Sequence, residues 1–237
     1  MTNPTIDILL KRKSVRVFED KEISPEIKDL IIKATMQAPT AGNSMFYSVI
    51  DVTCQKIKDK LAVTCDNQPF ISKAPMVWVF VADYRRWLRK FEQAGCKDIR
   101  PLGMGDLLLA ANDTVIAAHT ACVAAEALGI GSCYIGDIIE KWEEHQKLFE
   151  LPEYVIPVSM LVFGYPTQQQ IDRVGPKRFP TEMIVFENTY KDLDDKQLEE
   201  YYPTENTEAY FNRKYSADFS LEMNRSSDEM IKNWIGK

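Results

Sequence analysis

The chain has 237 residues, of which 45% are hydrophobic and 27% are charged, a composition typical of globular proteins that excludes a disordered, collagen-like or coiled-coil chain. The net charge is −6, and 12 acidic against 7 basic residues between 187 and 237 leave the first 186 residues close to neutral. This balance argues against a nucleic-acid partner, which would require a basic surface.

The N-terminal part predicts two helices separated by a basic segment. Apolar residues at helical spacing indicate a short first helix, at Ile6, Leu9 and Leu10. Residues 12–18, Arg-Lys-Ser-Val-Arg-Val-Phe, are typical of an extended segment. Ser24-Pro25 predicts the start of a second helix, with Ser as N-cap and Pro in the first turn, and this helix should stop before Pro39.

Several apolar stretches predict the core. Residues 48–52 and 76–82 indicate strands, and the second is apolar on both faces, which predicts a central strand covered on both sides. Residues 106–128 predict the longest helix. It is apolar nearly all round and rich in small residues, so we expect it in the core or at a subunit interface. Gly129 should end this helix, and residues 155–163 predict another strand.

The C-terminal quarter has a different character. Residues 187–222 are polar but carry scattered aromatic side chains, at Tyr190, Tyr201, Tyr202, Tyr210, Phe211, Tyr215 and Phe219. Such a segment is too apolar for a free tail and too polar for a core, so we expect it to wrap a surface, its own or a partner subunit's. Ser226 and Glu229 match a capping box, which predicts a final helix that starts at Ser226.

Cysteine and histidine usage predicts a cytoplasmic protein without a metal centre. The five cysteines form no C-x-x-C pair, and no secretory signal follows Met1. The longest charge-free apolar run, 114–125, is too short to span a membrane. With only His119 and His145, a histidine-rich metal site is excluded. We expect His119 to be a core histidine and Cys133 to be a buried filler rather than a nucleophile.

The first basic segment is a candidate anion site. In an extended chain the side chains of Arg12, Ser14 and Arg16 lie on one face, and those of Val15 and Val17 on the other. Two guanidinium groups around a hydroxyl suit a phosphate. A solvated basic edge strand would show the same pattern.

Three further segments carry ligand-binding signals. Small residues in 39–44 let the backbone approach a ligand, and Asn43 offers a donor and an acceptor, although an ordinary turn explains them too. Residues 129–136 are glycine-rich, but they follow a helix and have the wrong spacing for a dinucleotide-binding motif. Residues 129–136 can still form a loop of small residues that, with Tyr134, lines a flat ligand. Lys177-Arg178 is a second basic pair, for which a surface loop is the alternative.

These segments and a few others form an ordered set: 12–18, 38–43, 66–68, 74–75, 129–136, 163–166 and 176–180. The set resembles the FMN-dependent nitroreductase family. Residues 224–226 are similar to the C-terminal arm of its oxygen-insensitive NAD(P)H nitroreductase and flavin reductase subgroup.

The resemblance implies an α+β, nitroreductase-like fold, in which a central β-sheet is flanked by helices. It also implies an intertwined homodimer with two FMN sites at the subunit interface. Residues 1–186 would form the FMN-binding core. Residues 187–237 would form a C-terminal extension that wraps the partner subunit.

By the same resemblance, the FMN contacts fall on Arg12, Lys13, Ser14, Arg16, Thr40, Asn43, Gln68, Tyr134, Ile135, Gly136, Lys177 and Arg178. The first basic segment would bind the phosphate and the polar edge of the ring, with Arg16 near N1 and C2=O. The 39–44 loop and Gln68 would lie near the isoalloxazine or ribityl groups. Residues 134–136 would cover the ring near N5, and the late basic pair would reach the phosphate.

The chain departs from the family pattern at three places. Asp137 stands where the subgroup often has a second Gly, and Met45-Phe46 stands where many members have Gln-Pro. Lys177 and Arg178 follow a proline where relatives often have Lys-Pro-Arg, so either residue can be the phosphate contact. These changes bear on the substrate pocket and donor choice more than on FMN.

The function that follows is an NAD(P)H oxidoreductase working by ping-pong hydride transfer. NADPH or NADH would be the donor, and a nitroaromatic, a quinone or free flavin the oxidant, so little acid–base machinery on the protein is needed. The alternatives are a flavin-binding carrier or sensor without turnover, another flavin reaction on the same scaffold, and a phosphate-binding domain without flavin.

Overall fold

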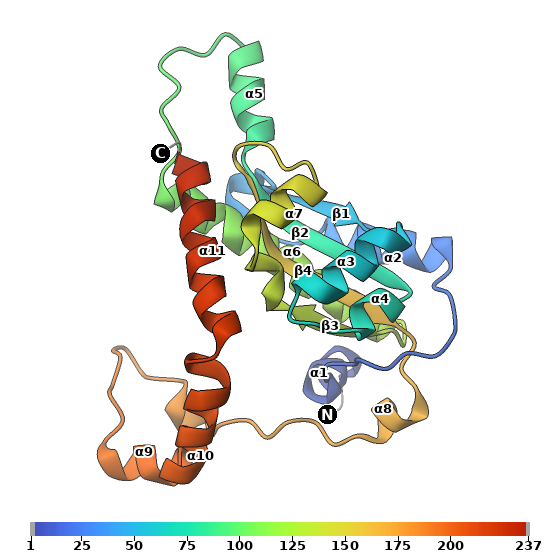
Figure 1. The fold of residues 1–237 in the computed structure, drawn as a ribbon, viewed down its shortest axis with the longest axis vertical. Helices are drawn as coiled ribbons and strands as arrows, with labels where there is room; N and C mark the ends of the chain where they lie inside the picture. Colours follow the sequence, from blue (N-terminus) through green and yellow to red (C-terminus); the bar gives the residue numbers. More distant parts are fainter. Residues whose placement is uncertain (1–2, 236–237) are drawn as a thin grey trace.

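The computed structural model describes residues 3–235, which form a four-stranded antiparallel sheet with helices on both faces (Figure 1). The strands are β1 (Tyr47–Asp51), β2 (Met76–Asp83), β3 (Gly131–Ile135) and β4 (Val155–Gly164). Their order across the sheet is β1-β2-β4-β3. Every residue of β2 is buried and the strand is central, as its two-sided apolar pattern predicts. The α+β architecture is confirmed.

Strand β3 replaces the loop expected at residues 129–136. It pairs with β4 in a register that joins Gly131 to Gly164 and Ile135 to Met160. Its short, small-residue sequence hides the alternation that marks a strand, and the pairing with β4 determines its conformation. The sheet therefore ends in an edge strand that sequence periodicity does not reveal.

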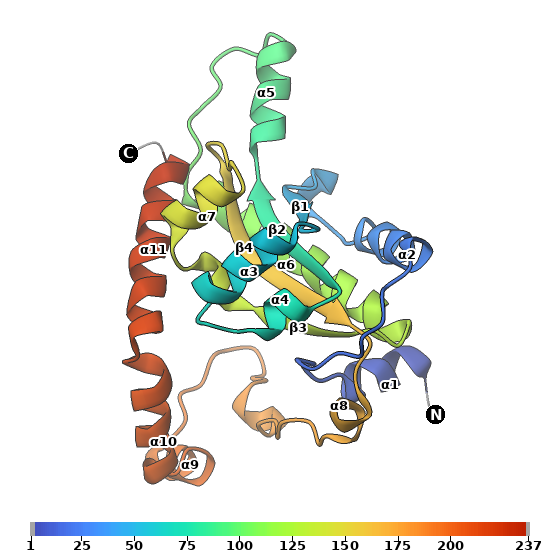
Figure 2. The same cartoon turned by 45° about the vertical axis from the view of Figure 1, so that its right-hand side comes forward.

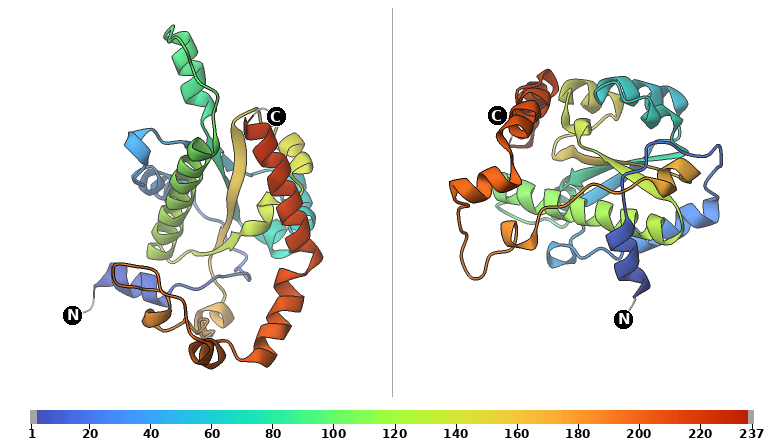
Figure 3. Two further views of the ribbon diagram at one scale, coloured as in Figure 1. Left: turned by 90° about the vertical axis from the view of Figure 1, so that its left-hand side faces the viewer. Right: turned by 90° about the horizontal axis from the view of Figure 1, so that it is seen from below.

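One face of the sheet is covered by α2 (Pro25–Thr35) and α6 (Met104–Ala127), and Figure 3 shows α6 on the side opposite the C-terminal helix. Ser24 caps α2 and accepts a hydrogen bond from the Ile27 amide, as its sequence predicts. Alanines of α6, such as Ala117 and Ala121, lie fully buried in the same cluster as Trp78 of β2. Small side chains let the helix approach the large aromatic residues of the strand.

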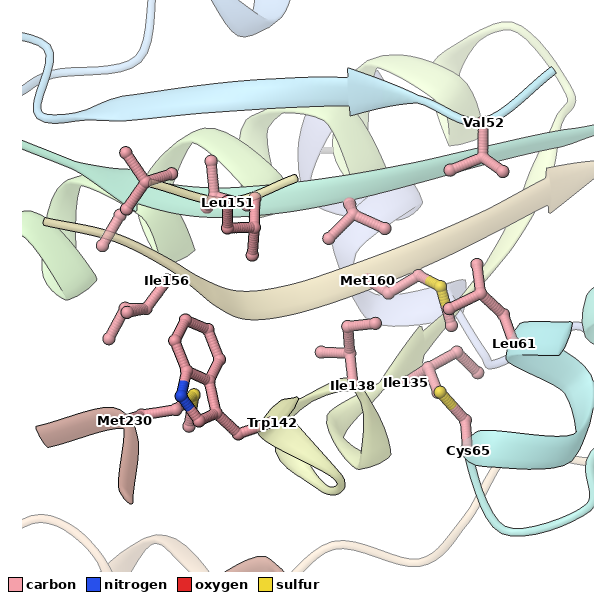
Figure 4. Packing of buried hydrophobic residues seen from close by; sticks show 14 of the residues in the cluster. Val52, Leu61, Cys65, Ile135, Ile138, Trp142, Leu151, Ile156, Met160 and Met230 are labelled. Carbon is pink, nitrogen blue, oxygen red and sulfur yellow. The ribbon is translucent and has the colours of Figure 1, made fainter. Parts of the chain in front are cut away.

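The other face carries α3 (Gln55–Thr64), α4 (Phe70–Lys73), the short 3-10 helix η2 (Gly136–Ile139), α7 (Trp142–Leu148) and part of α11 (Asp218–Ile235). Its core contains side chains from the sheet and from all these layers, among them Leu61, Cys65, Ile138, Trp142, Met160 and Met230 (Figure 4). One core cluster thus contains residues from Leu61 to Met230.

Helix α6 is long and apolar enough to cross a membrane by length and composition. Ten of its residues are nevertheless buried, and the helix packs against the sheet and α2, as a core helix does. Gly129 follows it with φ of +74° and so occupies the predicted C′ position. Other α6 side chains remain exposed and apolar: Leu108, Leu109, Val115 and Ile116.

Several smaller elements surround this core: α1 (Pro4–Lys11), η1 (Ala41–Asn43), α5 (Arg85–Gln93), α8 (Gln168–Asp172), η3 (Thr181–Met183), α9 (Asp195–Tyr201), α10 (Thr204–Tyr210) and the π-helix η4 (Phe211–Tyr215). Helix α5 projects away from the sheet in both Figures 1 and 2. Helices α9 and α10 lie at the other end, and much of the segment around them is exposed.

The last helix begins earlier than predicted. α11 starts at Asp218, and Ser226 lies in its interior, fully buried, so the capping-box interpretation is wrong. The Ser226 hydroxyl accepts from the Trp142 amide at 2.9 Å and donates to the Ile139 carbonyl at 2.6 Å. It therefore fastens α11 to the segment between η2 and α7 of its own subunit.

The core histidine is His145 rather than His119. His119 lies on an exposed side of α6, whereas His145 is fully buried. Its ring nitrogens lie 2.9 Å from the Ile138 carbonyl and 2.8 Å from the Thr64 hydroxyl. Burial lowers the pKa of His145, so the neutral ring joins α3, η2 and α7. The prediction that His119 is a core histidine was wrong because α6 is buried along only part of its circumference.

Candidate functional site

The first basic segment lies along the edge strand β3. The Val15 amide donates to the Ser132 carbonyl at 2.9 Å, and Ser14 and Ser132 form a parallel bridge. Val15 is buried against Gly131, where an added Cβ would lie 2.5 Å from Val15 Cγ2. A glycine at 131 is therefore what allows the basic segment to approach the sheet this closely.

The alternation predicted for this segment holds only in part. Val15 points into the core, but Val17 is 47% exposed and Phe18 packs on Gly164 instead. The segment makes isolated bridges at Ser14 and Phe18 rather than a continuous ladder, so its side chains do not keep a strict period of two.

A cavity of about 790 Å³ opens between α1, the end of α6 and the chain after β4. Three of the predicted phosphate-binding cations line it: Arg12, Lys13 and Arg178. The Lys13 ammonium also donates to the Ile171 carbonyl at 2.5 Å, which holds its charge at the cavity wall. The cavity thus joins the beginning of the chain to the segment after α8.

One carboxylate faces these cations. Glu126, at the end of α6, lines the same cavity, and its Oε2 atom is buried without a hydrogen-bond partner in the described part of the chain. Burial raises the pKa of Glu126, while Arg12 and Lys13 act in the opposite direction. Lys11 also lines the cavity, so four cations stand against one acid and the cavity favours an anion.

Ser14 and Arg16 lie beside this cavity rather than in its wall. The Arg16 guanidinium lies 5.9 Å from the centroid of the Phe70 ring, and the Arg16 amide donates to Gln170 Oε1 at 3.3 Å. Ser14 and Arg16 also face the Cys133 thiol. Burial raises the pKa of this thiol, and the two neighbouring groups lower it. Arg16 is exposed and free of an ion pair within residues 3–235.

Gln68 meets the segment after β3. Its Nε2 donates to the Cys65 carbonyl at 2.9 Å and to Asp137 Oδ2 at 2.8 Å. Because both amide hydrogens are used, the side-chain carbonyl of Gln68 is left to accept from a ligand. The structure thereby brings Gln68 and the 134–137 segment together, as their shared place in the predicted site requires.

Within that segment only Gly136 is exposed. Ile135 is buried in the core below α3, and Tyr134 packs on the α6 side, where its hydroxyl is buried without a partner among residues 3–235. Burial raises the pKa of Tyr134. A ligand at this place would meet the backbone at Gly136 rather than these two side chains.

Thr40 and Asn43 lie elsewhere. They precede β1, at the sheet edge opposite β3, in a loop held by a buried carboxylate of α6. Asp113 accepts from the Ala41 amide at 2.8 Å and from the Phe46 amide at 3.1 Å. Asn43 is exposed, with φ of +57°. Within one chain the predicted FMN residues therefore fall in two separate places.

Comparison with known proteins identifies the family. The family model described as "Nitroreductase family" matches residues 9–165, about two thirds of the chain. The chain belongs to the nitroreductase family. The match begins within α1 and ends just after β4, so it contains the basic segment, the Asp113 loop, Gln68 and the Gly136 turn.

Three members of the nitroreductase family illustrate the similarity. The oxygen-insensitive NADPH nitroreductase of Salmonella typhimurium is 33% identical over 85% of this chain and 84% of its own. The FMN reductase [NAD(P)H] of Bacillus subtilis is 34% identical over 84% and 83%. The NADPH:FMN oxidoreductase of Vibrio harveyi, solved in complex with NAD+, has a TM-score of 0.80 and 25% identity over 97% of this chain and 98% of its own.

Sequence reasoning about this nitroreductase-family chain missed three acidic residues of the site region: Asp113, Glu126 and Glu140. Asp113 and Glu126 do carry a signal, because a carboxylate within an otherwise apolar helix needs a partner. Glu140 carries none, since it stands in a run of charged residues and only the fold buries it.

Proposed function

We propose that the chain is an FMN-dependent NAD(P)H oxidoreductase that reduces nitroaromatics, quinones or free flavin. The observation that carries this proposal is the convergence of Arg12, Lys13 and Arg178 on one cavity. Its volume lies within the roughly 300–1,000 Å³ of ordinary cofactor pockets, and three cations suit a phosphate monoester. The names of the relatives, which include NADPH and NAD(P)H enzymes, support both donors.

Each residue contributes binding or orientation. Arg12, Lys13 and Arg178 would hold the FMN phosphate, the exposed Arg16 guanidinium would stabilise negative charge at the polar edge of the ring, and the Gln68 carbonyl would accept an N–H. FMN, when bound, supplies the hydride chemistry at N5. The lining of the cavity favours Arg178 over Lys177 as the late phosphate contact, since Lys177 does not line it.

We propose a homodimer as the working form. Thr40 and Asn43 precede one edge strand and Arg12 lies by the other, and three strand spacings separate these edges by roughly 14 Å. A second copy would bring the Thr40 loop of one subunit to the cation cavity of the other. The exposed apolar side chains of α6, such as Leu108 and Val115, offer a surface for that contact. Five free cysteines suit a cytoplasmic setting.

The visible absorption spectrum of the purified protein, before and after anaerobic NADPH or NADH, tests the function. We expect flavin bands that either donor bleaches. Bands that neither donor bleaches would favour the carrier, and a colourless protein that cannot be reconstituted with FMN would refute the proposal. Arg178→Ala should weaken FMN binding about tenfold or more, whereas Lys177→Ala, its neighbour outside the cavity, should leave it within about twofold.

A further inference from the structure

Two acidic side chains lie one turn apart immediately after β3. Asp137 is the second residue of η2, and Glu140 caps its end. In a 3-10 helix the side chains at positions i and i+3 lie directly above one another. Asp137 and Glu140 therefore lie on the same side of this turn, close enough for the Asp137 carboxylate to act on Glu140.

Glu140 is the buried member of the pair. It is 3% exposed, and its Oε1 atom is buried with no hydrogen-bond partner within residues 3–235. An ionised carboxylate in that place would lose its hydration, and Lys141 alone among the neighbouring charges would offset the loss, whereas a carboxylic acid can donate its hydrogen to Asp137. The geometry thus favours one proton shared by the two groups.

Most of the charges around Glu140 also favour its protonated form. Six titratable or charged groups face Glu140 or pack against η2 from α3, α7 and α11: Cys65, Asp66, Asp137, Lys141, Glu222 and His145, whose buried ring is neutral. Lys141 is the one cation in this set, and Glu222 is already paired with Arg225. Burial and the Asp137 charge raise the pKa of Glu140 to about 8, so the acid form prevails at neutral pH.

The pair also reaches the candidate site. Asp137 is half-buried, follows the exposed Gly136 and accepts a hydrogen bond from Gln68. A continuous row of polar groups therefore leads from the buried Glu140 through Asp137 to the two residues expected beside the flavin ring. Core packing alone would not require a carboxyl group at Glu140 and another at Asp137.

We propose that Asp137 and Glu140 hold one proton beside Gly136 and deliver it to the oxidant during turnover. This inference rests on the proposed oxidoreductase function. Asp137 would hand over the proton, and Glu140, which acts through it, is a positioning residue.

The chemistry requires this proton. A quinone that has received a hydride equivalent from NAD(P)H carries two new electrons and one hydrogen, so it is the hydroquinone monoanion. One proton on its free oxygen completes the hydroquinone. The pair releases that proton, carries two negative charges for a moment and takes up a proton from water, which restores the starting state.

The test mixes the protein, already reduced with NADPH, with 1,4-benzoquinone at pH values from about 6 to about 9, and follows flavin reoxidation. In the unaltered protein the rate should fall as pH rises through about 8. Glu140→Gln should abolish this pH dependence and slow reoxidation about 100-fold. Asp137→Asn should slow it too and shift the inflection to lower pH, because Glu140 loses its charged neighbour.

A second readout needs no turnover. The infrared spectrum of the oxidised protein at neutral pH should contain a protonated-carboxyl band that Glu140→Gln removes. Glu144→Gln, the matched control, alters an exposed carboxylate of α7 paired with Lys60 and should change neither readout. An unchanged pH profile and an unchanged infrared band in Glu140→Gln would overturn the inference. If that variant does not fold, an unchanged inflection in Asp137→Asn overturns it. A protein that never binds or reduces flavin would instead refute the proposed function.

Discussion

The hydroxyl of Ser226 offers the sharpest test of the fold. It is fully buried and bonded to the Trp142 amide and the Ile139 carbonyl. Ser226→Ala would leave both backbone groups buried and unpaired, and at about 1–3 kcal/mol for each the variant should lose about 2–6 kcal/mol of its free energy of unfolding. Ser226→Asp should be worse, since it buries a carboxylate against a carbonyl oxygen.

Equilibrium urea denaturation at a fixed protein concentration measures these losses. Ser227→Ala is the matched control: the Ser227 hydroxyl donates only to the Met223 carbonyl of its own helix, so we expect a change within about 0.5 kcal/mol. A helix N-cap at 226 would behave differently, with a loss of about 1 kcal/mol in the alanine variant and almost none in the aspartate variant. An aspartate variant as stable as the parent would refute the buried geometry.

Three further perturbations have definite expected outcomes. Because the pKa of Glu140 is raised from 4.5 to about 8, its contribution to stability is fully present below pH 4.5 and is lost as pH rises to about 8; at about 1.4 kcal/mol per unit, this loss should approach about 5 kcal/mol in denaturation curves and be absent from Glu140→Gln. Asp113→Ala should unpair two amides at about 1–3 kcal/mol each and speed hydrogen exchange at Ala41 and Phe46, whereas slow exchange there would contradict the anchoring role. Gly131→Ala should force Val15 away from β3, lower stability by about 1–3 kcal/mol in thermal denaturation and weaken FMN retention; wild-type retention would show that the close approach is unnecessary.

The main features of the fold could be predicted wherever burial leaves a one-dimensional pattern. The two-sided apolar run of β2 and the long apolar stretch of α6 indicate their own environments, and Ser24 and Gly129 mark helix ends through local backbone chemistry. Strand β3 and the start of α11 could not be predicted in this way, because their conformations depend on partners distant in the sequence. Ser226 shows the difficulty: its spacing from Glu229 matches a cap, but α7 and η2 decide its environment.

The candidate site also has features that could be predicted from the sequence and features that depend on the fold. Basic residues can be recognised by their chemistry, and Arg12, Lys13 and Arg178 do meet at one cavity, although Arg178 is 165 or more residues away from the other two. Which side chains reach a surface could not be predicted, since that depends on how β3 and η2 pack: Ile135 is buried, Tyr134 is half-buried and Gly136, the first residue of η2, is exposed. The acidity of Glu140 is likewise a property of its surroundings rather than of its sequence position.

The pairing of the N-terminal segment with β3 also bears on aggregation. An edge strand with unpaired amides and carbonyls is a template for strands of other molecules. Ser14 and Val15 occupy part of that edge, and the same segment supplies the cations of the proposed phosphate site. Cofactor binding and edge protection are therefore carried by neighbouring residues of one segment. Loss of the ligand would loosen the segment and uncover β3, so the unliganded protein should self-associate through this edge, and shortening the N-terminus should have the same effect.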